Sequence, residues 1–167
     1  MKSLLPLFLL AATPTTGAVA ISGYIQALTP QIGEHRADRL GRLIYEASTH
    51  ADIDPFLLAA IVRKESTFRS GLKVCYIRHA QNACFATCDL GISQINQSWV
   101  SRWHLDEDLL RYDDGYNLRV ASRILSNIKR DYGDEETYWS RYNSSTDSSR
   151  VRYEAGVESY LALADRT

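Results

Sequence analysis

The sequence predicts an all-α or predominantly α-helical fold built as a single domain. Apolar residues recur at helical spacing through most of the chain, several segments carry helix start or stop signals, and strand signals are nearly absent. The chain has 167 residues, of which 45% are hydrophobic and 23% charged. This length accommodates one domain with a substantial core and is too short for two ordinary ones.

Residues 1–20 have the three parts of a secretory signal peptide. Lys2 provides a positive charge, Leu4–Ala12 forms an apolar run, and Ala18-Val19-Ala20 offers the small residues of a cleavage site. The run is shorter than the roughly 20 residues that a transmembrane helix needs. We therefore expect cleavage after Ala20 and an exported protein without a transmembrane span. The alternative is an uncleaved N-terminal anchor.

The domain proper is expected over residues 37–167, after a weakly structured approach segment over residues 21–36. A first helix is indicated by apolar residues at helical spacing, namely Leu40, Leu43, Ile44 and Ala47. Asp54 and Pro55 form a good helix start, because Asp can cap the helix and Pro at its first position sacrifices no bonded N–H. The second helix is predicted over Pro55–Glu65.

Residues 71–90 show no sustained periodicity and are expected to form an irregular loop. They contain all three cysteines of the chain, Cys75, Cys84 and Cys88. In an oxidising compartment two of the three are expected to form a disulfide, and the pattern does not select the pair. A zinc site formed by the three cysteines and His79 is the alternative, although its spacing matches no standard zinc motif.

The C-terminal half is predicted to be helical throughout. A short helix is expected over residues 92–103 and a long one over residues 117–132, where Gly133 follows as a stop signal. Two further helices are expected over residues 135–142 and 149–164. The last of these places Val157, Tyr160, Leu161 and Ala164 on one face.

Glu65 is the first candidate for a catalytic residue. It lies four residues after Ile61 and seven after Leu58, so it continues the apolar stripe of its own helix. Removing a carboxyl group from water raises its pKa, which suits a general acid near neutral pH. The alternative is a structural ion pair with one of the neighbouring bases Arg63, Lys64 and Arg69.

Four short motifs, in the order in which they occur, favour a catalytic role for Glu65 over a structural ion pair. Glu65-Ser66 is followed by the string DLGISQIN at residues 89–96, then by Tyr116-Asn117 and by Tyr142-Asn143. In this order and spacing they resemble the lytic transglycosylases with a goose-type lysozyme-like domain, glycoside hydrolase family 23. The resemblance covers roughly residues 43–163. The string DLGISQIN is most similar to the small specialised members that serve conjugation, secretion systems or phage particles.

The resemblance implies a lysozyme-like domain with Glu65 as the sole catalytic acid and base. It implies that substrate is bound by Ser66, Gly91, Gln94, Tyr142 and Asn143. Asn117 is expected to fix a helix start. This sequence departs from the family pattern at Ser93, where the family has Met, and at residues 144–145, where Ser-Ser replaces Gly-Gly. Asp89 is expected to be either a helix cap or a second carboxylate in the site.

The function implied is cleavage of the glycan strands of peptidoglycan with formation of 1,6-anhydromuramyl ends, in the periplasm or cell envelope. No metal or cofactor is implied, and components of a secretion, conjugation or phage assembly are the expected partners. Two alternatives stay open: a muramidase in which Asp89 positions water, and a non-catalytic glycan-binding component of an envelope-spanning machine. A formal net charge of -1 argues against a broad nucleic-acid surface.

Overall fold

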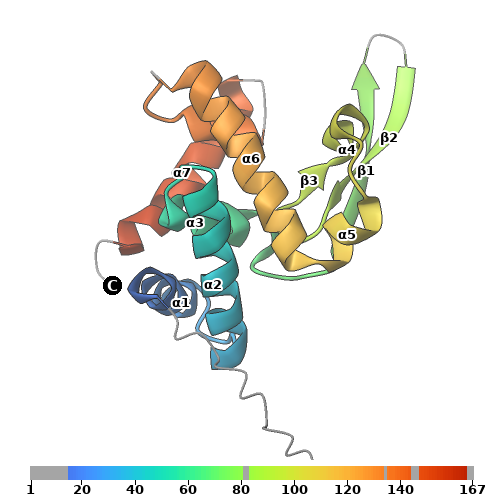
Figure 1. Ribbon diagram of the computed structural model, residues 1–167. Helices are drawn as coiled ribbons and strands as arrows, with labels where there is room; N and C mark the ends of the chain where they lie inside the picture. The colour runs from blue at the N-terminus through green and yellow to red at the C-terminus, as the bar shows by residue number, and fades with distance from the viewer. Residues whose placement is uncertain (1–14, 81–82, 134, 144–146, 165–167) are drawn as a thin grey trace, which may run out of the picture.

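The computed structural model describes residues 15–80, 83–133, 135–143 and 147–164, apart from the side chains of residues 78–80 and 83–85. Helices form most of the molecule, and a small antiparallel sheet stands to one side of them (Figure 1). The predicted fold class, predominantly α, is confirmed. The segment expected to be an irregular loop is the main exception within this class.

Helix α1, Thr16–Leu28, occupies the segment that was expected to be weakly structured, so that prediction is wrong. The Thr15 hydroxyl caps the helix by accepting from the Ala18 amide. Four large side chains at helical spacing are buried, namely Ile21, Tyr24, Ile25 and Leu28. The helix therefore belongs to the core and is not an extension outside it.

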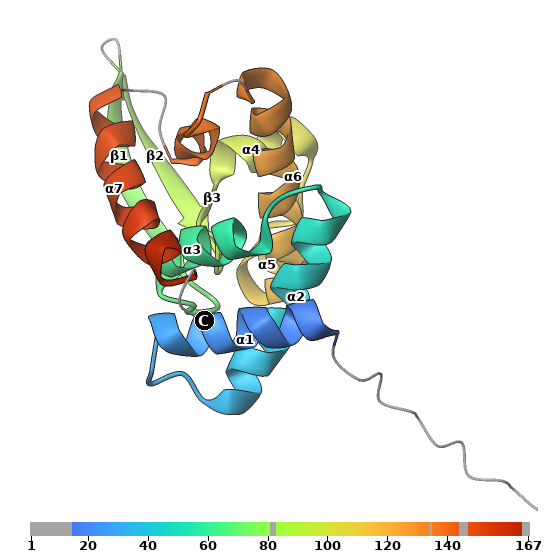
Figure 2. The same ribbon diagram turned by 90° about the vertical axis from the view of Figure 1, so that its left-hand side faces the viewer.

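Helix α2, Glu34–His50, contains the apolar stripe predicted for the first helix of the domain. It lies across α1 (Figure 2). The two backbones approach closely at Gly41, where a Cβ atom would lie 2.8 Å from the Ala18 carbonyl oxygen. Glycine is therefore required at this crossing, because any side chain would push the helices apart.

Helix α3, Pro55–Ser66, begins where Asp54 and Pro55 predicted a start. The Asp54 carboxylate accepts a hydrogen bond from the Phe56 amide, as expected for an N-cap. Every residue from Leu57 to Val62 is buried, and α3 packs against α1, α2 and α7. Its position in the middle of the helical layers makes its last turn a rigid support for the site.

Residues 73–90 form a β-hairpin, which corrects the prediction of a loop. Strand β1, Lys73–Ala80, pairs antiparallel with β2, Ala83–Leu90, in the register Lys73↔Leu90 to Ala80↔Ala83. The short strand β3, Ile95–Asn96, completes the order β1-β2-β3. The outer part of the hairpin projects beyond the helices (Figure 1), while its base packs against neighbouring helices and joins the core through Cys88 and Leu90. A helix was predicted over residues 92–103, but only its second part is helical.

The remaining helices surround the sheet and α3. Helix α4 is Gln97–Trp103, α5 is Glu107–Tyr112, and α6 is Asp114–Tyr132, which includes the long helix predicted to end at Gly133. A 3₁₀ helix, η1, spans Tyr138–Tyr142, and α7 spans Asp147–Ala164. Helix α6 packs on α2, α5 and η1, while α7 packs on α3. This packing brings η1 and α7 beside the end of α3.

Candidate active site

Glu65 lies in the last turn of α3, at the point where the helix leaves the core. After Ser66 the chain bends sharply, because Thr67 and Phe68 both have positive φ, 55° and 58°. The bend is held by the buried Phe68 side chain and by Arg63, which donates to the Thr67 hydroxyl over 2.9 Å. Non-glycine residues adopt this backbone at a cost, so two in succession show that the surroundings enforce the turn.

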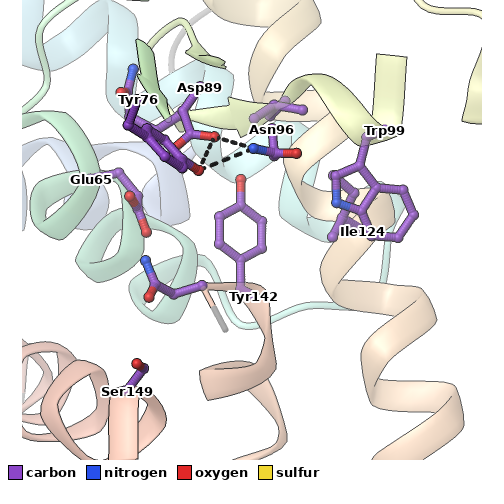
Figure 3. Close-up of a pocket in the computed structure, with 11 residues that line it drawn as sticks. Glu65, Tyr76, Asp89, Asn96, Trp99, Ile124, Tyr142 and Ser149 are labelled. Atoms are coloured by element: carbon purple, nitrogen blue, oxygen red, sulfur yellow. Dashed lines mark hydrogen bonds between the residues drawn. The ribbon is translucent and has the colours of Figure 1, made fainter. Parts of the chain in front are cut away.

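The Glu65 carboxyl group reaches a cavity of about 360 Å³ between the helices and the sheet (Figure 3). Side chains from almost every surrounding element line it: Glu65, Tyr76, Asp89, Gln94, Ile95, Asn96, Trp99, Ile124, Tyr142, Asn143 and Ser149. Carboxyl, amide and hydroxyl groups stand beside aromatic rings. That combination can hydrogen-bond the hydroxyl and amide groups of a sugar and pack against its apolar ring face.

The environment of Glu65 favours its protonated form. Burial is the main cause and, together with the negative charge of Asp89, raises the pKa of Glu65 from 4.5 to about 7. Hydrogen bonds from Tyr153 and Asn143 act in the opposite direction, as does the charge of Lys64. A carboxyl group with this pKa can donate a proton near neutral pH and take one back.

Tyr153 reaches Glu65 from α7, the helix packed against α3. Its hydroxyl donates to the Glu65 carboxyl oxygen Oε1 over 2.7 Å, and its ring is almost fully buried. Burial and the neighbouring Glu65 carboxylate raise the pKa of Tyr153 well above its usual value. Tyr153 therefore stays a hydrogen-bond donor and fixes the direction of the carboxyl group.

A polar cluster of Tyr76, Asp89 and Asn96 lines the sheet side of the cavity (Figure 3). The Asn96 amide donates to the Asp89 carboxylate over 2.7 Å and to the Tyr76 hydroxyl over 3.2 Å, while Tyr76 also donates to Asp89 over 3.3 Å. Asp89 lies on β2 and is not a helix cap, so that alternative is wrong. The site thus contains a second carboxylate.

Three of the predicted substrate-binding residues, Gln94, Tyr142 and Asn143, line the cavity. The Tyr142 hydroxyl donates to the Ser93 carbonyl oxygen over 2.9 Å, which ties η1 to the turn before β3. The Gln94 amide donates to the Gly91 carbonyl oxygen over 2.7 Å, and Gln94 has a positive φ of 49°. These contacts hold the two sides of the cavity in one arrangement.

Ser66 and Gly91, the other two predicted binding residues, do not line the cavity. The buried Ser66 hydroxyl donates to the Val62 carbonyl oxygen within its own helix. Gly91 has a φ of +74°, and a Cβ there would lie 2.1 Å from the Leu110 carbonyl oxygen and 2.3 Å from the Asn117 amide nitrogen. The close approach that requires glycine is therefore to the protein itself.

The family to which this chain belongs follows from its similarity to known protein families. The family model of the transglycosylase SLT domain matches residues 42–156, which is more than half of the chain. The chain belongs to the transglycosylase SLT family. The match runs from α2 into α7 and includes Glu65 and the residues lining its cavity. No curated protein matches the chain.

Membership of the SLT family establishes the general function of this domain. It is a domain of the lytic-transglycosylase type, whose substrate is peptidoglycan and whose place of action is outside the cytoplasm. Within the described ranges, no helix combines the length and apolarity needed to cross a membrane. Among the side chains that the structure describes, no group of three or more His, Cys, Asp or Glu residues is arranged to hold a metal ion.

Several residues of the SLT site were not identified from the sequence pattern. Tyr153 precedes Val157 by four residues and therefore extends the apolar face predicted for the last helix, and this spacing is the signal that could have identified it. Tyr76 and Asn96 were missed because their strands were not predicted. Trp99 lines the cavity, whereas Trp103 packs behind it with ring centroids 4.8 Å apart.

The disulfide of the SLT domain joins Cys75 and Cys88, one of the pairs left open by the sequence. The two residues face each other across β1 and β2, with Cα atoms 4.0 Å apart. A site with three cysteine ligands is thereby excluded, because two of them are oxidised. The side chains of His79 and Cys84 lie outside those described. The bridge directly adjoins Tyr76 and Asp89 of the cavity.

Proposed function

We propose that this SLT domain is a lytic transglycosylase that cleaves the β-1,4 bond between N-acetylmuramic acid and N-acetylglucosamine. The main observation in support of this proposal is the environment of the Glu65 carboxyl group. Its half-buried carboxyl group has a pKa of about 7 and faces a polar, aromatic-walled cavity. A glycosidase needs such a group to protonate the leaving oxygen.

The reaction proposed uses Glu65 twice. Its proton goes to the glycosidic oxygen as the bond from that oxygen to the anomeric carbon breaks. The carbonyl oxygen of the substrate's own N-acetyl group stabilises the positive charge that develops. The Glu65 carboxylate then takes the proton of the muramyl 6-hydroxyl as that oxygen bonds to the anomeric carbon. Glu65 ends protonated, no water is consumed, and intramolecular attack gains from effective molarity.

The remaining predicted residues are assigned different roles. Gln94, Tyr142 and Asn143, which line the cavity, are proposed to contact the glycan directly. Ser66 and Gly91 are proposed to support the site without contacting the glycan: Ser66 stabilises the end of α3, and Gly91 allows the turn before β3. Tyr153 is a positioning residue in this scheme, because it acts through its hydrogen bond to Glu65.

A muramidase is the second candidate, and Asp89 is the observation that favours it. This carboxylate lines the same cavity as Glu65, and its charge acts on the Glu65 pKa. A second carboxylate can activate or position a water molecule for attack on the anomeric carbon. The product would then be a reducing muramyl end instead of an anhydro end.

Digestion of purified sacculi separates the two reactions. The soluble fragments are analysed by mass spectrometry, since a reducing end is heavier than an anhydro end by one water. Anhydro ends are the result expected for the transglycosylase. Reducing ends throughout would contradict the mechanism and favour hydrolysis. Asp89→Asn supplies the internal comparison, because it should abolish hydrolysis while leaving anhydro ends in place.

Glu65→Gln tests whether the SLT domain is an enzyme at all. The amide keeps the shape of the side chain but has no acidic proton to transfer, so turnover should fall on the order of a hundredfold to ten-thousandfold. Unchanged release of fragments by this variant would remove Glu65 from the mechanism. A folded wild-type protein that binds sacculi without releasing fragments would instead support a non-catalytic glycan-binding role.

Export by a signal peptide over residues 1–20 is part of the proposal, with the periplasm or cell envelope as destination. Residues 1–14 lie outside the described residues. Cleavage after Ala20 would remove the Thr15 cap and the first turn of α1 but keep the buried Ile21, Tyr24, Ile25 and Leu28. Intact mass of the secreted protein gives the cleavage point. Retention of the full mass in the envelope would favour the uncleaved anchor.

The resemblance to small specialised members supports a role in locally opening the wall for a conjugation, secretion or phage assembly. Chromosomal or plasmid deletion with restoration by the wild-type gene, but not by the Glu65→Gln form, tests this role. Transfer, secretion or infection efficiency is the quantity measured. An unchanged efficiency after deletion in all three processes would contradict it.

A further inference from the structure

A second cavity of the SLT domain, larger than that of the active site, lies away from it. It has a volume of about 610 Å³ and is a groove between α2 and α6, with lining residues Leu43, Glu46, Ala47, His50, Ala51, Gly115, Arg119, Arg123 and Ser126. None of these residues lines the active-site cavity. We call this surface the α2–α6 groove.

The floor of the α2–α6 groove is made of small and apolar residues. Ala47 and Gly115 are buried, and Leu43 and Ala51 pack against the core at its edges. Small side chains on two packed helices leave a depression into which larger side chains of another molecule can fit. The charged residues Glu46, Arg119 and Arg123 are exposed. The Arg119 guanidinium reaches over Gly115, where it would lie 3.3 Å from an added Cβ, the same distance as the Asp113 carboxylate.

Arg119 and Arg123 make the α2–α6 groove favour a negatively charged partner. They lie one helical turn apart on α6, and neither forms a hydrogen bond or ion pair with any residue that the structure describes. The Arg123 guanidinium is held over the Trp103 ring at 4.6 Å from its centroid. Among the described lining residues Glu46 is the only acid beside these two arginines, so the lining carries a net positive charge.

The dimensions of the groove match a short helix. Its lining runs from Leu43 to Ala51 along one side and from Gly115 to Ser126 along the other. At the rise of an α-helix these spans are about 12 Å and about 16 Å, which is roughly two to three helical turns. Amphipathic helices commonly bind in such grooves through apolar side chains spaced one turn apart.

We propose that the α2–α6 groove is a docking site for an acidic amphipathic helix of a partner protein. Apolar side chains of that helix would cover Leu43, Ala47 and Ala51, and two carboxylates one turn apart would pair with Arg119 and Arg123. The groove and the active-site cavity lie on different faces of α6, since Arg123 lines one and Ile124 the other. A docked partner would leave the cleft open to glycan.

The test uses a displayed library of helical peptides of about 14 residues, long enough to cover the groove. Apolar residues occupy one face, and the flanking positions are drawn from Glu, Gln and Lys. The library is selected on the full-length Glu65→Gln protein, so that no wall cleavage enters the measurement. Selected peptides are then titrated against the wild type by anisotropy, with tryptophan fluorescence as a second signal because Arg123 stacks on Trp103.

Enrichment of Glu pairs one turn apart is the expected result. Affinity for these peptides should fall by about tenfold or more in Arg119→Glu with Arg123→Glu, since two attractions become repulsions. Arg42→Glu is the matched control: this exposed arginine lies on α2 outside the groove lining, and affinity should be unchanged. If the double reversal does not fold by circular dichroism, Arg119→Gln with Arg123→Gln replaces it, and a weaker loss is expected.

Several outcomes would overturn the proposal. Selection of Lys-rich or uncharged peptides, the absence of any enrichment, or binding that survives both double variants would show that the groove does not recognise an acidic helix. A dimer in analytical ultracentrifugation that the double reversal dissolves would make a second copy of the chain the occupant. Flotation with anionic lipid vesicles that depends on Arg119 and Arg123 would make a membrane surface the occupant.

Discussion

The hydroxyl group of Tyr153 donates a 2.7 Å hydrogen bond to the Glu65 carboxyl group, joining residues 88 positions apart in the chain. The bond crosses the packed interface of α3 and α7, so the orientation of the proposed catalytic acid depends on the last helix. On the other side of Glu65, the negative charge of Asp89 on β2 raises the pKa of the Glu65 carboxyl group. The two neighbours shift its pKa in opposite directions, and this opposition can be measured.

Tyr153→Phe should move the alkaline limb of the pH–activity profile to higher pH. The hydroxyl stabilises the ionised carboxylate, so its removal raises the Glu65 pKa and keeps the acid protonated further into the alkaline range. Turnover should fall at the same time, because the carboxyl group loses its orientation. Tyr160→Phe is the control on the same helix, since Arg63 contacts the Tyr160 ring and not its hydroxyl. A limb that does not move would contradict the role of Tyr153.

Asp89→Asn should move the same limb to lower pH. The Asp89 charge disfavours ionisation of Glu65, so its removal lowers the Glu65 pKa. Asn can keep a hydrogen bond to the Asn96 side chain, which limits structural change. Asp108→Asn removes an exposed charge outside the cavity and should leave the limb in place. A shift toward higher pH in Asp89→Asn would show that the two carboxyl groups do not interact as described.

The half-buried Glu65 carboxyl group should also lower the stability of the fold at alkaline pH. Glu65 releases its proton near pH 4.5 in the unfolded chain and near about 7 in the folded one. Between these values the folded state binds the extra proton, so stability falls as pH rises and then stays low. Glu65→Gln has no such proton. Its stability relative to wild type should therefore rise by on the order of 3 kcal/mol across this interval.

Urea unfolding at acidic and alkaline pH measures that difference. The comparison is the change between the two pH values and not the absolute stability of either protein, because the amide also alters the bond to Tyr153. An equal difference between variant and wild type at both pH values would mean that the Glu65 pKa is not raised by folding.

The Cys75–Cys88 bridge should stabilise the protein and support activity together. It closes a loop with a sequence separation of 13, and bridges around loops of this size contribute about 3 kcal/mol. Tyr76 and Asp89 adjoin the two cysteines and line the cavity, so a looser hairpin should disturb them. Cys75→Ser with Cys88→Ser should lower both the melting temperature and turnover. Cys84→Ser, which keeps the bridge, is the control.

Gly91→Ala should be strongly destabilising, by about 3 kcal/mol or more. The position has a φ of +74°, and the added methyl group would overlap the Leu110 carbonyl oxygen. Gly23→Ala is a matched control, because outside its chain neighbours and the backbone of α1 no described atom lies within 4 Å of a Cβ at that position. There the change should be neutral or slightly stabilising, since Ala favours helix over Gly. Equal effects in thermal unfolding would contradict the close approach at Gly91.

The helices with strong periodicity and clear caps could be predicted from the sequence. Leu40, Ile44 and Ala47 specify the buried face of α2, and Asp54 with Pro55 specifies the start of α3. Helix α1 could not be recognised once its first residues were assigned to a signal peptide. That assignment divided the pattern that runs from Ala18 through Ile25 to Leu28.

The hairpin could not be predicted because it has neither a regular apolar alternation nor a typical turn sequence. Val74 and Ile77 are both exposed although they point to opposite faces of β1, so burial does not alternate along the strand. The residues between the strands, Gln81 and Asn82, are not a preferred hairpin turn pair. Asp89 and Asn96 therefore could not be placed beside Glu65 before the fold was known.

The side chain of Asn117 on α6 holds the turn before β3, which includes Gln94 of the cavity. Its amide donates to the carbonyl oxygens of Leu90 and Leu110, and its oxygen accepts from the Ser93 amide. These are backbone atoms, so one side chain of α6 fixes the path of the turn before β3. The side chain of Ser93 is fully buried as well, so a change at residue 117 should displace the turn and with it Gln94 of the cavity.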